Sequence, residues 1–157
     1  MDLEINDLIN SSIKGLTPYE PGKPIEDLER EYQIKKAVKL ASNESPLGPS
    51  PKVLKALEKQ LSGVHRYPDG NGFQLKQALS SKHSVDKSVL TLGNGSNDII
   101  EFVARCFLSP KDNAIYSKYA FAVYPLIVQA LGAEGIEVEA KDWGHDLQSM
   151  LDAINKE

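Results

Sequence analysis

A glycine-rich turn is the segment of this sequence that is best suited to binding a charged ligand. It lies between an apolar strand pattern and a helix pattern and reads Gly93-Asn94-Gly95-Ser96-Asn97. Such a turn leaves backbone N–H groups unpaired at a helix N-terminus, where the helix dipole favours an anion. This predicts a phosphate site at the carboxyl edge of a parallel sheet. The alternative is a plain turn capped by Ser96, with Asp98 and Glu101 already complementing the dipole.

An aromatic residue, Phe121, opens the next helix pattern and should lie at the same edge of the sheet. Its ring could stack on a flat cofactor, although a core phenylalanine is the simpler interpretation. The other reactive residue types give no site. The three histidines are scattered without metal-ligand spacing, so no metal site is predicted. Cys106 lies among apolar residues and is expected to be a small buried hydrophobe.

Five motifs then occur in a recognisable order. They are Leu16-Thr17-Pro18-Tyr19-Glu20-Pro21-Gly22-Lys23-Pro24, Leu40-Ala41-Ser42-Asn43-Glu44-Ser45-Pro46-Leu47-Gly48-Pro49, Arg66-Tyr67-Pro68-Asp69-Gly70, Gly93-Asn94-Gly95-Ser96-Asn97-Asp98 and Tyr119-Ala120-Phe121-Ala122-Val123-Tyr124. From about Ile13 onward, the chain closely resembles the N-terminal part of the histidinol-phosphate aminotransferases. These are class II pyridoxal-phosphate aminotransferases of the aspartate-aminotransferase fold. Threonine-phosphate decarboxylase and aromatic aminotransferases share the same opening and remain alternatives.

The resemblance implies cofactor-binding roles for five residues. Gly95, Ser96 and Asn97 match the turn that holds the phosphate of pyridoxal 5'-phosphate, and Phe121 matches the aromatic residue that stacks on its ring. Tyr67 matches a tyrosine that reaches the cofactor phosphate of the neighbouring subunit, which implies a homodimer. The phosphate role agrees with the anion site inferred from the glycine turn itself.

The resemblance also implies a substrate side and a reaction. Tyr19 matches an arm residue near the phosphate end of the substrate, and Asn43 lies in a segment that lines the substrate side. The reaction would be transamination between histidinol phosphate and 2-oxoglutarate, giving imidazole-acetol phosphate and glutamate. The cofactor ring acts as the electron sink in such chemistry.

The Schiff-base lysine of the family is not found in these 157 residues. Lysines are present at 111, 118, 141 and 156, but none lies in a Ser-x-Lys context after a late strand. No catalytic residue is therefore assigned, and the chain alone is expected to be an inactive N-terminal part. A hypothesis of another class also stays open, namely a complete, non-catalytic α/β phosphate-binding module.

The elements that must position these residues follow an alternating pattern. Strands are predicted over 36–40, 88–92, 114–116 and 135–139. Helices are predicted over 3–13, 25–32, 51–61, 73–83, from the glycine turn to 108, over 121–131 and from Asp146 to 154. Alternating strands and helices indicate an α/β fold, a three-layer α/β/α arrangement with a mostly parallel sheet that is incomplete here. The predicted organisation is an N-terminal helix and proline-rich arm (1–36), a connecting segment (37–84) and the first part of a cofactor-binding domain (85–157).

Composition excludes several other classes of protein. The 157 residues are 41% hydrophobic and 25% charged, with a net charge of −4 and one cysteine. There is no membrane-spanning apolar run, no signal-peptide pattern and no basic cluster for nucleic acid. The expected location is the cytoplasm, with small molecules as ligands. A half-finished sheet with an apolar helix over 121–131 also predicts aggregation or self-association.

Overall fold

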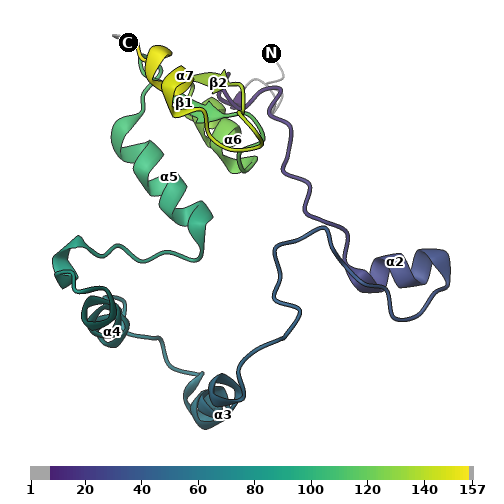
Figure 1. Ribbon diagram of the computed structural model, residues 1–157. Coiled ribbons are helices and arrows are strands. Elements are labelled where there is room, and N and C mark those ends of the chain that lie inside the picture. The colour runs from purple at the N-terminus through teal and green to yellow at the C-terminus, as the bar shows by residue number, and fades with distance from the viewer. Residues whose placement is uncertain (1–7, 156–157) are drawn as a thin grey trace. The chain divides into compact units, whose positions relative to one another are not determined.

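The computed structural model describes residues 8–155 (Figure 1). By their internal contacts, these residues belong to two compact units. Residues 20–90 form one of them, called here the helical unit. The described residues on either side, 8–19 and 91–155, form the other, called here the sheet unit. The three-part organisation expected from the sequence stays a prediction.

The sheet unit carries the α/β pattern that the sequence predicts. Its elements are α5 (Ser96–Phe107), β1 (Asn113–Ser117), α6 (Val123–Ala130), β2 (Glu134–Val138) and α7 (Leu147–Asp152). The two strands are parallel, with Asn113 opposite Glu134 and Ser117 opposite Val138. A parallel pair needs a crossover connection, and α6 provides it. The strands predicted over 114–116 and 135–139 are confirmed to within a residue or two, and the fold is the incomplete α/β arrangement that was expected.

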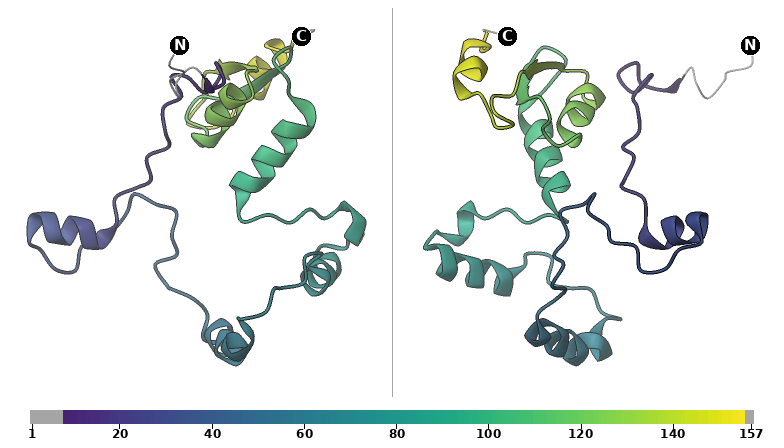
Figure 2. Two further views of the ribbon diagram at one scale, coloured as in Figure 1. Left: turned by 180° about the vertical axis from the view of Figure 1, so that it is seen from behind. Right: turned by 45° about the vertical axis from the view of Figure 1, so that its right-hand side comes forward.

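A small core forms where the elements of this unit meet. The buried apolar residues are Ala104, Val123, Val128 and Val138. Helix α6 packs on α5 and on both strands, and the views of Figure 2 show these elements together. Tyr116 lies against the neighbouring strand at Gly135, where an added Cβ would come within 2.6 Å of its hydroxyl. Partial burial raises the pKa of Tyr116 above its usual value.

The apolar helix predicted over 121–131 is less buried than expected. Only Val123 and Val128 are buried within α6, and Tyr124 is 41% exposed. An apolar groove of about 380 Å³ stays open between α5, α6 and β1. The reason is that a helix is covered only where neighbouring elements exist, and the described part of the sheet has two strands.

The helical unit is built from separate short helices. They are α2 (Ile25–Tyr32), α3 (Pro51–Gln60), η1 (Leu61–Gly63), α4 (Phe73–His83) and η2 (Lys87–Val89). Ser50 caps α3 by accepting a hydrogen bond from the Lys52 amide (3.3 Å), and Pro51 takes the first helical position, as the sequence predicts. No residue between 20 and 90 is buried.

Two predicted strands are wrong. Residues 36–40 are irregular, with Lys36 at φ 63°, and residues 88–92 contain the end of η2 followed by an extended segment. A strand needs a partner for its backbone N–H and C=O groups, and no paired neighbour lies beside either segment in the described part of the chain. An alternating or apolar sequence pattern was therefore not sufficient to predict a strand at these two positions.

The helix predicted over residues 3–13 can be compared with the structure from residue 8 onward. Residues 3–7 of the predicted 3–13 helix lie outside the described residues. Within the described part, residues 10–15 form hydrogen-bonded turns, with the Ile13 amide donating to the Asn10 carbonyl at 2.9 Å. Gly15 follows at φ 82°. Thus the helical pattern yields turns at this end.

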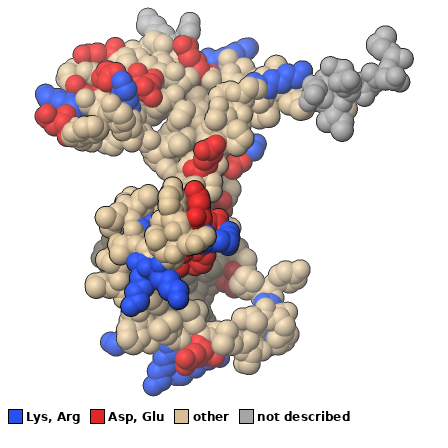
Figure 3. All heavy atoms as spheres, turned by 90° about the vertical axis from the view of Figure 1, so that its right-hand side faces the viewer, with Lys and Arg blue, Asp and Glu red and all other residues tan. Residues whose placement is uncertain are grey.

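No helix among residues 8–155 has the length and apolar character needed to cross a membrane. Acidic and basic side chains both occur on the face drawn in Figure 3.

Candidate functional site

The glycine turn leads directly into α5 and leaves its first turn without a side-chain cap. Gly95 is the N-cap residue, with φ 89° and ψ −179°, and Ser96 is the first helical residue. This backbone region is accessible essentially to glycine alone. An added Cβ at Gly95 would meet nothing within 4 Å, so its requirement for glycine is conformational. The alternative in which Ser96 caps the helix is therefore wrong.

Asp98 stabilises the turn from inside the helix. One of its carboxylate oxygens accepts from the Asn94 amide (2.8 Å) and from the Asn94 side chain (3.2 Å). Gly93 allows this close packing, because an added Cβ there would lie 2.8 Å from the Asp98 Cβ. The carboxylate thus binds Asn94, ahead of the helix. The amides at Gly95–Asn97 stand at the positive end of a twelve-residue helix, where an anion is favoured.

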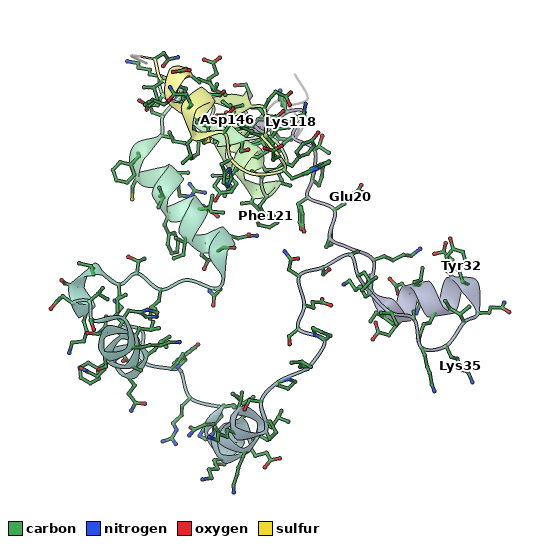
Figure 4. The ribbon with its side chains drawn as sticks, viewed as in Figure 1. Glu20, Tyr32, Lys35, Lys118, Phe121 and Asp146 are labelled. Carbon is green, nitrogen blue, oxygen red and sulfur yellow. The ribbon has the colours of Figure 1, made fainter. Side chains whose placement is uncertain are left out.

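Phe121 lies in the turn that connects β1 to α6 (Figure 4). The Ala120 amide donates to the Ser117 carbonyl (3.0 Å), and Tyr119 between them has φ 64°. The ring of Phe121 is 41% exposed, which does not fit the simple core interpretation. It lines a cavity of about 380 Å³ together with Tyr119, Tyr124, Trp143, His145 and Met150. The cavity offers aromatic faces at the carboxyl end of β1.

Tyr19 contacts Phe121 although the two residues are far apart in the sequence. Their ring centroids are 5.9 Å apart and the planes are inclined by 78°, an edge-to-face arrangement. This geometry is favourable for aromatic pairs. The residue predicted for the substrate and the residue predicted for the cofactor ring therefore come together in the sheet unit.

A lysine also lies at this edge of the sheet, although sequence reasoning gave it no role. Lys118 is labelled in Figure 4. Its amide donates to the Val138 carbonyl (2.7 Å), and its Nζ pairs with a Glu139 oxygen (2.6 Å). This hydrogen bond raises the pKa of Lys118 above its usual value. A nucleophilic lysine needs its pKa lowered, so the pairing opposes that role. The expectation that Lys118 is not the Schiff-base lysine stays a prediction.

The hairpin at residues 141–144 is a second feature that sequence reasoning missed. Asp142 and Trp143 both have left-handed φ angles, 51° and 63°, between two backbone hydrogen bonds that join Lys141 and Gly144. Trp143 contacts Tyr119, with ring centroids 5.3 Å apart. Turns of this kind usually carry Asn-Gly or similar pairs, so an Asp-Trp pair gave no signal. Its effect is to place an indole at the cavity beside Phe121.

The remaining predicted site residues lie in the helical unit. Tyr67 is fully exposed, and Asn43 is exposed as well. Next to Tyr67, Asp69 accepts hydrogen bonds from the amides of Phe73 (2.7 Å) and Asn71 (3.0 Å), which lower the pKa of its carboxyl group. Asp69 thus shapes the turn that carries Tyr67. The sheet unit contains Tyr19, Gly95, Ser96, Asn97 and Phe121.

Cys106 is exposed, contrary to the prediction that it is a buried hydrophobe. It lies on α5, whose single buried residue is Ala104. The apolar pattern around it was read correctly as helical. Cys106 is not among the residues of α5 that line the groove against α6 and β1, so it does not share their apolar surroundings.

Comparison with known proteins identifies the kind of protein in which these features occur. The family model described as aminotransferase class I and II matches residues 35–157. The chain is 55% identical over 150 residues to histidinol-phosphate aminotransferase 1 of Nitrosococcus oceani, covering 96% of this chain and 40% of that protein. It is also 55% identical over 150 residues to histidinol-phosphate aminotransferase 2 of Pseudomonas aeruginosa, covering 94% of this chain and 41% of that protein.

A solved structure shows a similar fold. The crystal structure of histidinol-phosphate aminotransferase from Sinorhizobium meliloti in complex with pyridoxal-5'-phosphate matches with a TM-score of 0.80 at 25% identity. The match covers 92% of this chain and 38% of that one. The chain therefore spans about two fifths of the length of the proteins that it resembles.

Proposed function

The chain belongs to the class I and II aminotransferases, and on that premise we propose that it is part of an enzyme that transfers an amino group between histidinol phosphate and 2-oxoglutarate in histidine biosynthesis. The products are imidazole-acetol phosphate and glutamate. Two observations support this substrate: the ordered series of five motifs, and relatives of that name that are 55% identical.

The cofactor in this proposal is pyridoxal 5'-phosphate, and the residues present fit it. The amides of Gly95, Ser96 and Asn97 bind its phosphate, because α5 begins there without a side-chain cap. Phe121 supplies an exposed ring that can stack on the pyridine ring. When bound, the cofactor supplies the electron sink for the reaction. The uncapped glycine turn is the single observation that carries this proposal.

The substrate side is formed by Tyr19 and Asn43 in this proposal. The contact of Tyr19 with the Phe121 ring supports a position for Tyr19 beside the cofactor. Tyr67 serves the neighbouring subunit of a homodimer, and its full exposure leaves it available for that role. The enzyme acts in the cytoplasm and binds small molecules, and no role with nucleic acid or membranes is proposed.

A binding experiment tests the cofactor site in the chain itself. Trp143 is the only tryptophan and lines the cavity beside Phe121, so its fluorescence should fall when pyridoxal 5'-phosphate binds. Pyridoxal carries the same aldehyde without the phosphate and controls for reaction with surface lysines. Gly95→Ala should displace the amides that face the anion, because alanine is strained at this backbone conformation. Binding of the phosphate form should weaken by up to about tenfold, since an anion at a helix N-terminus is stabilised by roughly 0.3–2 kcal/mol.

Gly70→Ala provides the matched control, because Gly70 lies in a turn with open space around it and φ outside the left-handed range. Its affinity should equal that of the unaltered chain. Equal quenching by pyridoxal and by pyridoxal 5'-phosphate, or an unchanged affinity in Gly95→Ala, would remove the phosphate site from the proposal.

Activity measurements test the reaction. We propose that the 157-residue chain alone is inactive, because the lysines at 111, 118, 141 and 156 do not match the sequence context of the Schiff-base lysine. Incubation with histidinol phosphate and 2-oxoglutarate should release no glutamate. The intact gene product should convert histidinol phosphate, and a preference for threonine phosphate would instead support the decarboxylase relative. Steady turnover by the purified 157-residue chain would contradict the inactivity.

A further inference from the structure

An N-terminal segment of the sheet unit, residues 10–19 and called here the arm segment, lies along α6 and ends at Phe121. Its first anchor is Ser12, whose hydroxyl donates to the Ala130 carbonyl at 3.0 Å. The Asn10 side-chain oxygen accepts from the Ser12 amide at 3.2 Å and also lies 3.2 Å from the Ser12 hydroxyl. The hydroxyl therefore has two acceptors within reach, and its distance to the Ala130 carbonyl is the shorter one. Ser12 thereby joins the arm segment to the C-terminal end of α6.

The acceptor of this bond would otherwise lack a partner within its helix. Ala130 is the last residue of α6, and the final carbonyl groups of a helix have no intrahelical donor. The chain then turns at Gly132, which has φ 76°. An added Cβ at Gly132 would lie 3.6 Å from the Cβ of Ser12 and 3.4 Å from Pro110. Ser12 therefore packs closely against the turn that follows α6.

The middle of the arm segment is apolar and lies at a groove between α5 and α6. Ile13 and Leu16 line this groove, of about 280 Å³, together with Leu126 of α6, Leu131 just after it and Arg105 of α5. The Leu16 amide donates to the Ile13 carbonyl at 3.1 Å, which keeps both side chains within a single turn. Leu16 is half-buried and Ile13 is 41% exposed, so their partial burial adds to the attachment that Ser12 begins.

The other end of the arm segment reaches Phe121, just before the first residue of α6. Tyr19 meets the Phe121 ring edge-to-face at 5.9 Å. The arm segment therefore contacts α6 at its C-terminal end through Ser12 and reaches its N-terminal side through Tyr19. The eight residues of α6 span about 12 Å, and the arm segment runs along this length between its contacts at Ser12 and Tyr19.

We propose that Ser12 is a positioning residue for the Tyr19–Phe121 pair: its hydroxyl holds the arm segment on α6 and so places the edge of the Tyr19 ring against Phe121. Ser12 touches neither ring. The consequence for the cofactor and the substrate rests on the proposed function, whereas the positioning itself is a property of this chain.

The variant Ser12→Ala tests the hydrogen bond from Ser12 to the end of α6, and the measurements need no cofactor. We expect hydrogen exchange of the Leu16 amide to become about fivefold faster, the factor that corresponds to one hydrogen bond of about 1 kcal/mol. The nuclear Overhauser effect between the Tyr19 and Phe121 rings should weaken in the same variant. Exchange of the α5 amides beyond its first turn should stay unchanged, which distinguishes release of the arm segment from general unfolding.

Ser11→Ala is the matched control, since Ser11 is the adjacent serine and is exposed. It should leave the Leu16 exchange rate and the ring contact as they are. The proposal fails if Ser12→Ala and Ser11→Ala give the same Leu16 exchange rate, or if the ring contact keeps its strength in Ser12→Ala. Neither measurement involves pyridoxal 5'-phosphate, so a failed cofactor-binding test and a failed anchor are separate results.

Discussion

At the scale of single residues, two glycines of one turn are required for different reasons. Gly95 has a backbone conformation that other residues avoid, whereas Gly93 makes room for Asp98. The sequence predicted the turn and its position before a helix. It did not predict the hydrogen bonds, because Ser96 and Asp98 are both good capping residues and only the backbone path decides which one is used. Here Asp98 binds Asn94, and the amides at the start of α5 are left without a side-chain cap.

Gly95→Ala should destabilise the sheet unit. With φ 89° and ψ −179°, alanine at this position is strained by roughly 1–3 kcal/mol. Denaturant unfolding followed by the fluorescence of Trp143 measures the change. Gly144→Ala is the control in the same unit, because its Cβ would have an ordinary 3.5 Å contact and its φ lies outside the left-handed range. Similar midpoints for the two variants would contradict the assignment of strain to Gly95.

At the scale of elements, helix starts were the most predictable feature. Ser50 before Pro51 and Asp146 before α7 are confirmed as caps, because a cap depends on residues only a few positions apart. Strands were predicted correctly only where the structure provides a paired strand. Thus β1 and β2 were found, whereas 36–40 and 88–92 remain unpaired in the described part of the chain. Hydrogen bonds between strands are contacts between distant segments, and a local pattern cannot report them.

The cap of α7 should make this helix sensitive to acid. Asp146 accepts hydrogen bonds from the Ser149 amide (3.1 Å) and hydroxyl (3.0 Å), and these bonds lower its pKa from the usual 3.8. A lowered folded-state pKa means that the contribution is present above pH 3.8 and is lost as the pH falls through the folded value. A carboxyl titration by NMR should therefore give a pKa below 3.8 for Asp146.

Asp146→Ala checks the same cap at neutral pH. Exchange of the Ser149 amide should become faster, because its acceptor is removed. Asp152→Ala, at the other end of α7, should leave that amide unchanged. If the titration of Asp146 is ordinary and Ser149 exchange does not respond, the cap makes no contribution in solution.

At the scale of the whole molecule, apolar surface dominates the behaviour that we expect of the isolated chain. The groove between α5, α6 and β1 is lined by Val103, Phe107, Ile127 and other apolar side chains, and Phe107 is 75% exposed. Large exposed apolar patches usually mark interaction sites or promote aggregation. The few buried residues of the sheet unit give little core to oppose this tendency.

Self-association is therefore the expected state of the purified chain. Sedimentation velocity should show oligomers that grow with concentration, and Phe107→Gln should shift them toward the monomer by removing apolar surface from the groove. Leu147→Gln, on the exposed side of α7, should have little effect. A stable monomer over a wide range of concentration would contradict this expectation.

The sequence by itself determined the features that depend on neighbours along the chain: the glycine turn before α5, the caps of α3 and α7, and the family to which the ordered motifs belong. Only the tertiary structure decided that Tyr19 meets Phe121, that Ser12 binds the end of α6 and that Lys118 pairs with Glu139. The physical reason is the separation in sequence between the residues that interact. A cap or a turn is formed by residues a few positions apart, whereas these three contacts join segments that only the folded backbone brings together.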